Sequence, residues 1–434
     1  MPLTLCAIKA SKGFHLSLMN ELLLALSRQR SAISAFLLCS LFLLLTACDT
    51  SQPPIVPLSA WGEIRTLAQA EQSSAPALYV SSQGIVTAAW VGADDTGIHH
   101  DMRQGTGETV ILPLPPVHPY AQSLHPSAFD ETTHLLWLDA DYQLRNDPLT
   151  ANTQYLYAAL INSAQTVERG PTRISSRLTL HYTAVTSVDG GLWVAWSGGL
   201  PAEPELYTQR IDNAGRPLQP QRLAINADFP AIVRAEDGTL LLFWTQPTSG
   251  TVYRARLVEG IAQDITTISS SPVLNAGDRL VNVSASLDTT HAYLFWNIAR
   301  ADGHPETWWT SGAVEAEEWS LPQRLGIATM DEPFVTGFNG GAGIAASAGE
   351  TWLSWAAPMI GQYDMLPVGV YDGAQLGVVY LQGGAVVGYQ AVVAVDLLIG
   401  TPTLMSDRDR HLYLSWSYPT PAGYADLLLT STRR

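Results

Sequence analysis

Side chains that bind metals or transfer protons are concentrated in residues 92–101, which read GADDTGIHHD. Asp94, Asp95 and Asp101 offer carboxylate oxygens, and His99 and His100 offer imidazole nitrogens. Carboxylates around a glycine turn suit Ca²⁺, whereas imidazoles suit a transition metal. The spacing matches no standard site such as the EF-hand loop, and a solvated loop in an acidic protein is the alternative. We therefore expect no cofactor, with Ca²⁺ at Asp94, Asp95 and Asp101 as the exception that the segment leaves open.

Two further groups of residues could act on a sugar. Asp139 and Asp141, with Asp94, could form the acid and base of glycosidic cleavage, although carboxylates that solvate a turn are the alternative. Trp308 and Trp309 offer faces that stack on sugars, and His99 and His100 offer polar contacts. Adjacent strand residues point to opposite faces, so one of the two tryptophans is expected to pack inside the protein.

The charge balance excludes several functions. Residues 48–434 hold 19 of the 23 basic residues, all of them arginine, and 38 of the 39 acidic residues, a net charge of −19. A domain this acidic lacks the basic face that nucleic acid requires. No lysine follows Lys12, which excludes a Schiff base and a lysine-dependent phosphate loop.

The elements that must position these residues form a repeat. A short apolar run that ends in tryptophan recurs seven times, with a mean period near 54 residues. The runs are 85–90, 134–137, 192–196, 239–244, 292–296, 351–355 and 411–416. A strand-like segment and a turn such as Asp189-Gly190 precede each run, and a third and often an arginine-containing fourth strand follow. Four antiparallel strands per unit are typical of a propeller blade, so the fold class is an all-β propeller.

The ends of the chain predict how the ring closes. The last unit lacks a fourth strand, and an additional strand, Trp61–Ala68, precedes the first unit. We expect Trp61–Ala68 to pair outside Ala425–Thr430, which would remove an exposed sheet edge. Seven blades fit best, but the glycine-rich segment 337–401 leaves six or eight open, and paired β-sandwiches are the rival architecture. The loops after the tryptophans then share one face with the loops that enter each first strand, where His125 and His181 lie.

The amino terminus has the form of an export signal. Arg28 and Arg30 precede an apolar run over residues 32–47, shorter than a membrane-spanning helix. Leu45-Thr46-Ala47-Cys48 resembles the bacterial lipobox, which implies cleavage before Cys48 and lipid on its sulfur; an ordinary signal peptide is the alternative. The predicted domains are a leader at 1–47, with Met19 as a second possible start, a proline-rich tether at 48–60, and a propeller at 61–434. The implied location is the outer face of the cytoplasmic membrane, or the outer membrane in a diderm.

The repeat resembles the sialidase and BNR-repeat propellers. Ser187-Val188-Asp189-Gly190-Gly191-Leu192-Trp193 shares the first three landmarks of that family's Asp-box, with the tryptophan one place early. The resemblance implies a propeller and a sugar ligand. In place of the family's Arg-Ile-Pro motif the chain has Glu63-Ile64-Arg65-Thr66.

Three functions follow as hypotheses. The first is a monomeric, membrane-anchored, non-catalytic module that binds a surface glycan or an envelope protein. The second is a sialidase-like or other glycoside hydrolase, which Asp94→Ala or Asp139→Ala would inactivate. The third is an envelope-assembly scaffold that would co-purify with outer-membrane assembly proteins.

Lipid anchoring can be tested at Cys48. We expect Cys48→Ser to release the protein from the membrane fraction, because the serine hydroxyl cannot take the place of the acylated thiol. Globomycin should block maturation of the wild type, as judged by gel mobility. A soluble, unmodified wild-type product would contradict the anchor.

Overall fold

The structure is a computed structural model, and its described residues lie between Trp61 and Arg433. The ranges are 61–71, 77–80, 85–94, 97–104, 110–111, 122–129, 131–140, 154–164, 166–235, 237–268, 274–287, 290–301, 305–314, 318–324, 344–347, 350–358, 370–383, 385–407 and 409–433. The predicted leader, Cys48 and the tether lie outside these ranges. Within them, no helix has the length and apolarity needed to cross a bilayer.

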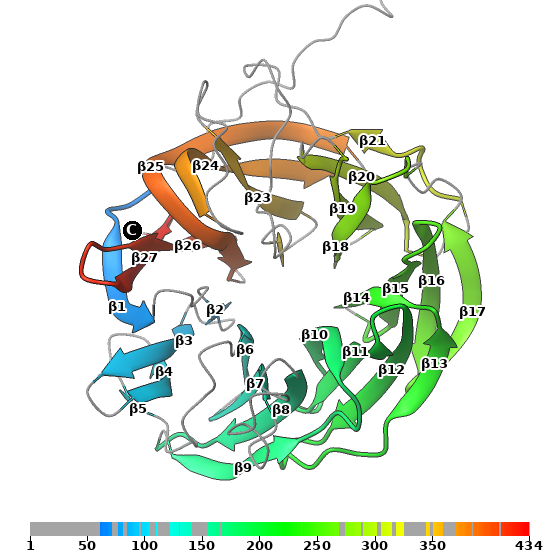
Figure 1. Cartoon of the computed structure of the whole chain (residues 1–434), viewed down its shortest axis with the longest axis horizontal. Coiled ribbons are helices and arrows are strands. Elements are labelled where there is room, and N and C mark those ends of the chain that lie inside the picture. The colour runs from blue at the N-terminus through cyan, green and yellow to red at the C-terminus, as the bar shows by residue number, and fades with distance from the viewer. Residues whose placement is uncertain are drawn as a thin grey trace, which may run out of the picture. The chain divides into compact units, whose positions relative to one another are not determined.

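Five four-stranded antiparallel sheets form the first five blades (Figure 1). Blade 1 is β2 (Ala77–Val80), β3 (Val86–Asp94), β4 (Gly97–Gln104) and β5 (Val110–Ile111). Blade 2 is β6 (Gln122–Phe129), β7 (Thr132–Ala140), β8 (Gln154–Ile161) and β9 (Val167–Arg173). Blade 3 is β10 (Thr179–Thr186), β11 (Leu192–Leu200), β12 (Glu203–Ile211) and β13 (Gln221–Ile225). Blade 4 is β14 (Asp228–Arg234), β15 (Leu240–Gln246), β16 (Thr251–Val258) and β17 (Ile261–Ile268). Blade 5 is β18 (Arg279–Leu287), β19 (His291–Ala299), β20 (Pro305–Ala313) and β21 (Gln323–Arg324).

A continuous sheet of seven strands contains the last two blades. Its strands are β22 (Ile344–Ser347), β23 (Glu350–Pro358), β24 (Val370–Gln382), β25 (Ala385–Ser406), β26 (Leu412–Pro419), β27 (Tyr424–Ser431) and β1 (Arg65–Glu71). The first part of β25 pairs with β24 as far as Ile399, and its last residues, Thr403–Ser406, pair with β26. One 22-residue strand is therefore the outer strand of blade 6 and the inner strand of blade 7. Seven blades are confirmed, and the glycine-rich segment was hard to divide because no turn separates these two strands.

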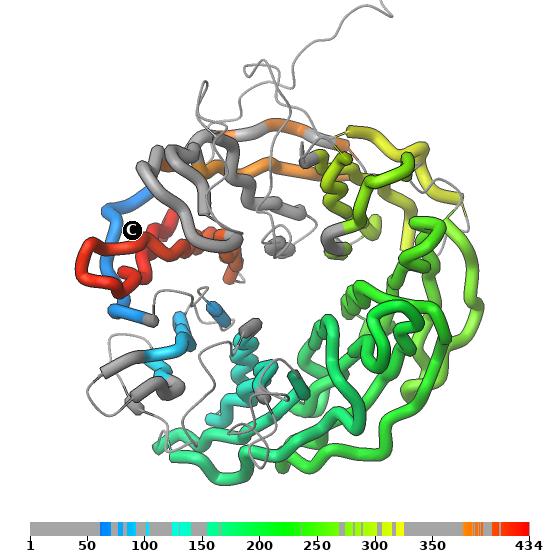
Figure 2. Tube along the Cα trace, viewed as in Figure 1, coloured from blue at the N-terminus to red at the C-terminus, as the bar shows by residue number. Residues whose placement is uncertain are grey.

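The amino-terminal strand closes the ring, as predicted. β1 pairs antiparallel with β27, from Arg65 opposite Leu429 to Glu71 opposite Tyr424 (Figure 2). The strand begins four residues later than the sequence suggested, but the Gly62 amide still donates to the Ser431 carbonyl at 2.8 Å. The Thr430 hydroxyl donates to the Gly62 carbonyl at 2.9 Å.

Five of the repeated tryptophans fill interfaces between blades. Trp90, Trp137, Trp196, Trp296 and Trp416 are each at most 1% exposed. Trp196 packs with Leu136 and Leu138 of blade 2, and Trp296 packs with Leu241 and Phe243 of blade 4. Because such burial is worth about 2–3 kcal/mol for each large apolar side chain, these contacts hold neighbouring blades in a fixed relation. The first strands of successive blades also contact one another around the whole ring.

The two ends of each blade are named here by their turns. The upper end carries the connection between the second and third strands and the entry into the first strand. The lower end carries the hairpin between the first and second strands and the turn between the third and fourth. The segment resembling an Asp-box, from Ser187 to Trp193, therefore lies at the lower end of blade 3, where the Asp189 carboxylate accepts hydrogen bonds from Ser187 and Arg210.

Ala70 tests the closure. Ala70 is fully buried on β1, against Trp90 of blade 1 and Leu427 of β27. Ala70→Asp would place an unpaired carboxylate in this interface, and we expect it to lower the free energy of unfolding by more than about 3 kcal/mol in urea titrations. The matched control is Thr66→Asp, at an exposed position of the same strand. Equal stability of the two variants would show that the strand is dispensable.

Candidate functional site

A row of polar residues crosses the upper end of blade 3. Strand register places His181 of β10 opposite Ser197 of β11 and places Gly198, the next residue, opposite Glu205 of β12. Tyr207 of β12 lies opposite Arg222 of β13. Adjacent strands are about 4.8 Å apart. These side chains therefore form a row that runs from the inner strand of the blade to its outer strand, and their positions along the strands differ by no more than two residues.

A histidine and an aspartate join blade 3 to blade 4 at this end. His181 Nδ1 lies 2.8 Å from Oδ1 of Asp228, the first residue of β14. The same carboxylate oxygen accepts the Ser197 hydroxyl and the Phe229 amide, the latter at 2.7 Å. The imidazole stacks on the Phe229 ring at a centroid distance of 4.2 Å. The side chain of His181 is 44% exposed and that of Asp228 only 9%, so the imidazole is open to a ligand while its partner is not.

This dyad can move a proton. Burial by itself raises the pKa of Asp228, but the hydrogen bonds from His181, Ser197 and the Phe229 amide outweigh it and hold that pKa below its ordinary value. An ionised carboxylate accepts the Nδ1 proton, which leaves Nε2 of a neutral imidazole as an acceptor. The arrangement is that of an oriented general base with a fixed tautomer.

Two arginines lie on either side of a carboxylate farther out on the blade. Arg177 Nη1 lies 2.8 Å from Glu205 Oε2, and Arg222 Nη1 lies 3.0 Å from Oε1. The Tyr207 hydroxyl also donates to Oε2. That hydrogen bond, and then the hydrogen bond from Arg222 and the charges of both arginines, lower the pKa of Glu205 against the effect of burial. The guanidinium side chains are 52% and 57% exposed, so their remaining N–H groups face solvent.

Tyr207 supports this cluster from below. Its ring stacks on the buried Trp196 at 4.2 Å, and its side chain is 7% exposed. Burial first, and then the bond to Glu205, raise the pKa of the phenol, which keeps it a neutral donor. Tyr207 and Glu205 therefore form a hydrogen-bonded pair. Because the phenol is buried, it positions Glu205 and does not face a ligand.

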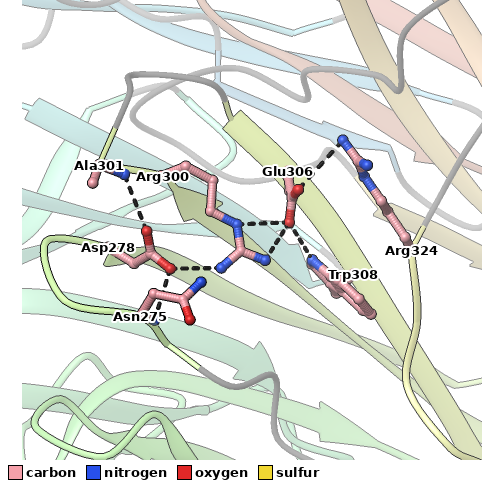
Figure 3. A network of polar contacts seen from close by, with 7 residues as sticks. All are labelled: Asn275, Asp278, Arg300, Ala301, Glu306, Trp308 and Arg324. Carbon is pink, nitrogen blue, oxygen red and sulfur yellow. Dashed lines mark hydrogen bonds and ion pairs between the residues drawn. The ribbon is translucent and has the colours of Figure 1, made fainter.

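Blade 5 contains a second copy of this arrangement (Figure 3). Trp308 takes the place of Tyr207, and its Nε1 donates to Glu306 at 2.9 Å. Arg324 on the fourth strand lies 3.4 Å from Glu306. Here Arg300 also bridges Glu306 and Asp278, with Nη1 at 2.6 Å from Asp278 Oδ2, and is only 18% exposed.

In blade 5 the corresponding network joins two loops to each other and does not expose a pair of arginines to a ligand. Asp278 also accepts the amides of Asn275 at 2.8 Å and Ala301 at 3.0 Å. The Asn275 amide, ahead of Arg300 and the Ala301 amide, lowers the pKa of Asp278 despite burial. The entry into β18 is thereby joined to the end of β19. Only blade 3 combines two half-exposed arginines with a proton-transfer dyad among the described residues, and we take it as the candidate site.

The segment 92–101 is a hairpin and not the loop that the sequence suggested. β3 runs to Asp94 and β4 starts at Gly97, with Trp90 opposite Asp101, so the described residues of this segment belong to two paired antiparallel strands. The side chains of Asp94, Asp95, His99 and His100 lie outside the description, as does Asp141. Asp101 and Asp139 are 6% and 1% exposed. Among the residues whose side chains are described, no three acidic, histidine or cysteine groups form a metal site, and the calcium and acid–base assignments stay predictions.

The remaining candidates lie as follows. Trp309 is 4% exposed and packs inside the protein, as expected for one of the adjacent pair, while Trp308 is partly exposed and bonds to Glu306. Burial lowers the pKa of His125 to about 4, so this imidazole is neutral at physiological pH. Asp407 is 4% exposed and accepts the amides of Asp409 and His411.

Sequence reasoning placed His181 at this face but missed its partners. Ser197, Glu205, Tyr207, Arg222 and Asp228 carried no motif on their own. A glutamate two residues before an aromatic residue on the third strand, followed by arginine on the fourth, occurs in both units as Glu205-Leu206-Tyr207 and Glu306-Thr307-Trp308. That repeated triplet was the available signal.

No protein-family model and no curated protein sequence matches the chain. A polysaccharide lyase structure superposes with a TM-score of 0.51 at 11% identity, covering 88% of this chain and 93% of that chain. An ulvan lyase of family PL25, described with bound -[GlcA(1-4)Rha3S]-, gives 0.53 at 9% identity, covering 84% and 95%. A Trypanosoma rangeli sialidase gives 0.44 at 11% identity, covering 88% and 58%. At these identities the lyases establish a shared propeller fold.

Proposed function

We propose that this protein is a carbohydrate-binding propeller that holds an acidic polysaccharide at the upper end of blade 3. The observation that carries the proposal is the pair of half-exposed guanidiniums of Arg177 and Arg222 on either side of Glu205. Each uses one nitrogen for Glu205 and retains further donors. Planar guanidiniums bind carboxylate and sulfate groups in bidentate fashion.

The charge of the whole domain sharpens this preference. Residues 48–434 carry a net charge of −19, so their surface repels a polyanion. A polyanion can therefore bind only where cations outnumber carboxylates locally, as Arg177 and Arg222 do around Glu205. The ligand bound in the ulvan lyase structure, which includes glucuronate and a sulfated rhamnose, has the anionic groups that such a site would select.

A second candidate is catalysis at the same site, favoured by the His181–Asp228 dyad. In β-elimination, Nε2 of His181 would take the proton next to the uronate carboxylate. The electron pair of the broken C–H bond would form the ring double bond as the glycosidic C–O bond breaks, and the departing sugar oxygen would take a proton from water. Arg177 or Arg222 would neutralise the substrate carboxylate. A glycoside hydrolase of the two-carboxylate type needs two available carboxylates, whereas Glu205 and Asp228 are both engaged by hydrogen bonds.

We further propose that the domain acts outside the cytoplasm, attached through Cys48 to a membrane. The support is the lipobox and the proline-rich tether of the sequence. An acidic polysaccharide is a component of cell surfaces and surroundings, so this location fits the proposed ligand. An envelope-protein partner stays the alternative.

Binding can be tested on the two arginines. We expect the double variant Arg177→Ala, Arg222→Ala to bind polygalacturonate or a sulfated polysaccharide about tenfold or more weakly, because two charge-assisted contacts are lost. Retention in affinity gels and calorimetry measure the change. Arg216→Ala, which removes an exposed arginine at the lower end, is the control and should behave as wild type. Undiminished binding by the double variant would refute the site.

Catalysis can be tested on the dyad. If the protein is a lyase, His181→Gln should lower kcat by about a hundredfold or more, and Asp228→Asn should lower kcat with KM unchanged, because it disturbs the imidazole tautomer. The ultraviolet absorbance of the unsaturated product reports elimination, and new reducing ends without it report hydrolysis. His291→Gln at the lower end is the control. Full activity in His181→Gln would remove the imidazole from the mechanism.

A further inference from the structure

A groove of about 660 Å³ lies between blades 3 and 4 at the lower end, opposite the candidate site. Its lining includes Thr239 at the hairpin into β15 and Glu259 at the turn into β17, which are both lower-end turns. Trp193, Arg210 and Gln221 line it from blade 3. The two blades therefore enclose a second concave surface that the proposed function does not use.

The charges of this groove are balanced. Arg210 forms an ion pair with Asp189. On the other side, the Thr239 amide and, more weakly, the charge of Arg256 lower the pKa of the exposed Asp237. Glu259 adds one further carboxylate to the lining. Unlike the upper end, where two arginines share one carboxylate, the groove has no excess of cations to select an anion.

Two buried polar atoms on its lining residues have no partner within the described part of the chain. Gln209 donates through Nε2 to the Leu218 carbonyl at 2.8 Å, which fixes the amide and leaves Oε1 as an unpaired acceptor. Arg210 Nε is an unpaired donor. An unsatisfied buried polar group costs about 1–3 kcal/mol, so a small shift of either side chain that brings its atom to the groove surface would be stabilised by a hydrogen bond to a ligand there. A hydroxyl can serve either atom, because it both donates and accepts.

The remaining walls suit a sugar ring. The indole of Trp193 lies 5.8 Å from the guanidinium of Arg210 and lines the groove together with Gly260. A Cβ on Gly260 would lie 2.9 Å from the indole, so glycine is required there. Leu218 and Val258 are 49% and 40% exposed and offer C–H surface beside the planar amide of Gln221. Alternating apolar and planar hydrogen-bonding groups match the faces and the hydroxyl edges of a saccharide.

We propose that the groove between blades 3 and 4 binds an uncharged saccharide through Gln209, Arg210 and Trp193, as a second carbohydrate site independent of the upper end. The protein would then hold an acidic chain at one end of the ring and a neutral glycan at the other. Such an arrangement would attach the domain to a neutral surface while its upper end engages the acidic polymer.

The test uses the full chain, purified in a zwitterionic detergent and titrated in a calorimeter with cellohexaose, maltohexaose, mannohexaose and N-acetylchitohexaose. We expect at least one of these probes to bind the wild type. The double variant Gln221→Ala, Arg256→Ala alters exposed or half-buried lining residues and should weaken that binding about tenfold or more. The control is Gln263→Ala, Arg216→Ala, which removes the same residue types outside the lining and should bind as wild type.

The outcomes separate this site from the upper one. Loss of neutral binding in the groove variant, with neutral binding retained in Arg177→Ala, Arg222→Ala, supports the proposal. No binding of any neutral probe to the wild type, or equal binding by the groove variant, overturns it whether or not acidic polysaccharide is still retained. Loss of acidic binding alone would concern only the upper end.

Discussion

The pairing of β1 with β27 is the contact on which the rest of the ring depends. It adds the fourth strand of blade 7 from the other end of the domain, so that β27 is paired on both sides. The same strand buries Ala70 in one cluster with Leu78 and Trp90 of blade 1 and Leu427 of blade 7. Closure and inter-blade packing are therefore one event. Without it the blades would have no fixed neighbours at the join, and residues on different blades would have no fixed distance.

The upper site needs that fixed distance. His181 and Asp228 belong to different blades and are 47 residues apart, yet their side chains meet at 2.8 Å. The buried Trp196 supports Tyr207, which in turn holds Glu205 between two arginines. The packing of Trp196 against Tyr207 and the polar contacts of Glu205 thus hold a row of charged side chains in fixed positions facing solvent. In a domain whose only strong bases are arginines, the placement of two of them beside an exposed imidazole is the main electrostatic feature of that end.

Blades 3 and 5 show how one structural unit serves two purposes. Both place a glutamate two residues before an aromatic residue whose N–H or O–H it accepts, with an arginine on the fourth strand. In blade 5, Asp278 and Arg300 complete the network and join two loops. In blade 3, no acidic residue occupies the equivalent place, and the arginines stay half exposed. The two blades share the contacts of the glutamate with the aromatic residue and with the arginine of the fourth strand. They differ in the residues that surround these contacts.

The sequence by itself determined the all-β ring, the tryptophan core and the closing strand, because strand periodicity, turns and a missing fourth strand are local patterns that repeat. It did not reveal that β25 runs unbroken through two blades, since Gly400 and Pro402, which lie where the strand changes partner, are residues that usually end a strand. It also mistook the β3–β4 hairpin for a loop, because acidic and histidine residues are concentrated where the two strands meet. Only the tertiary structure brought Arg177, Glu205 and Arg222 together and set Asp228 against His181. Such contacts depend on strand register and on the packing of one blade against the next, and the spacing of residues along the chain predicts neither.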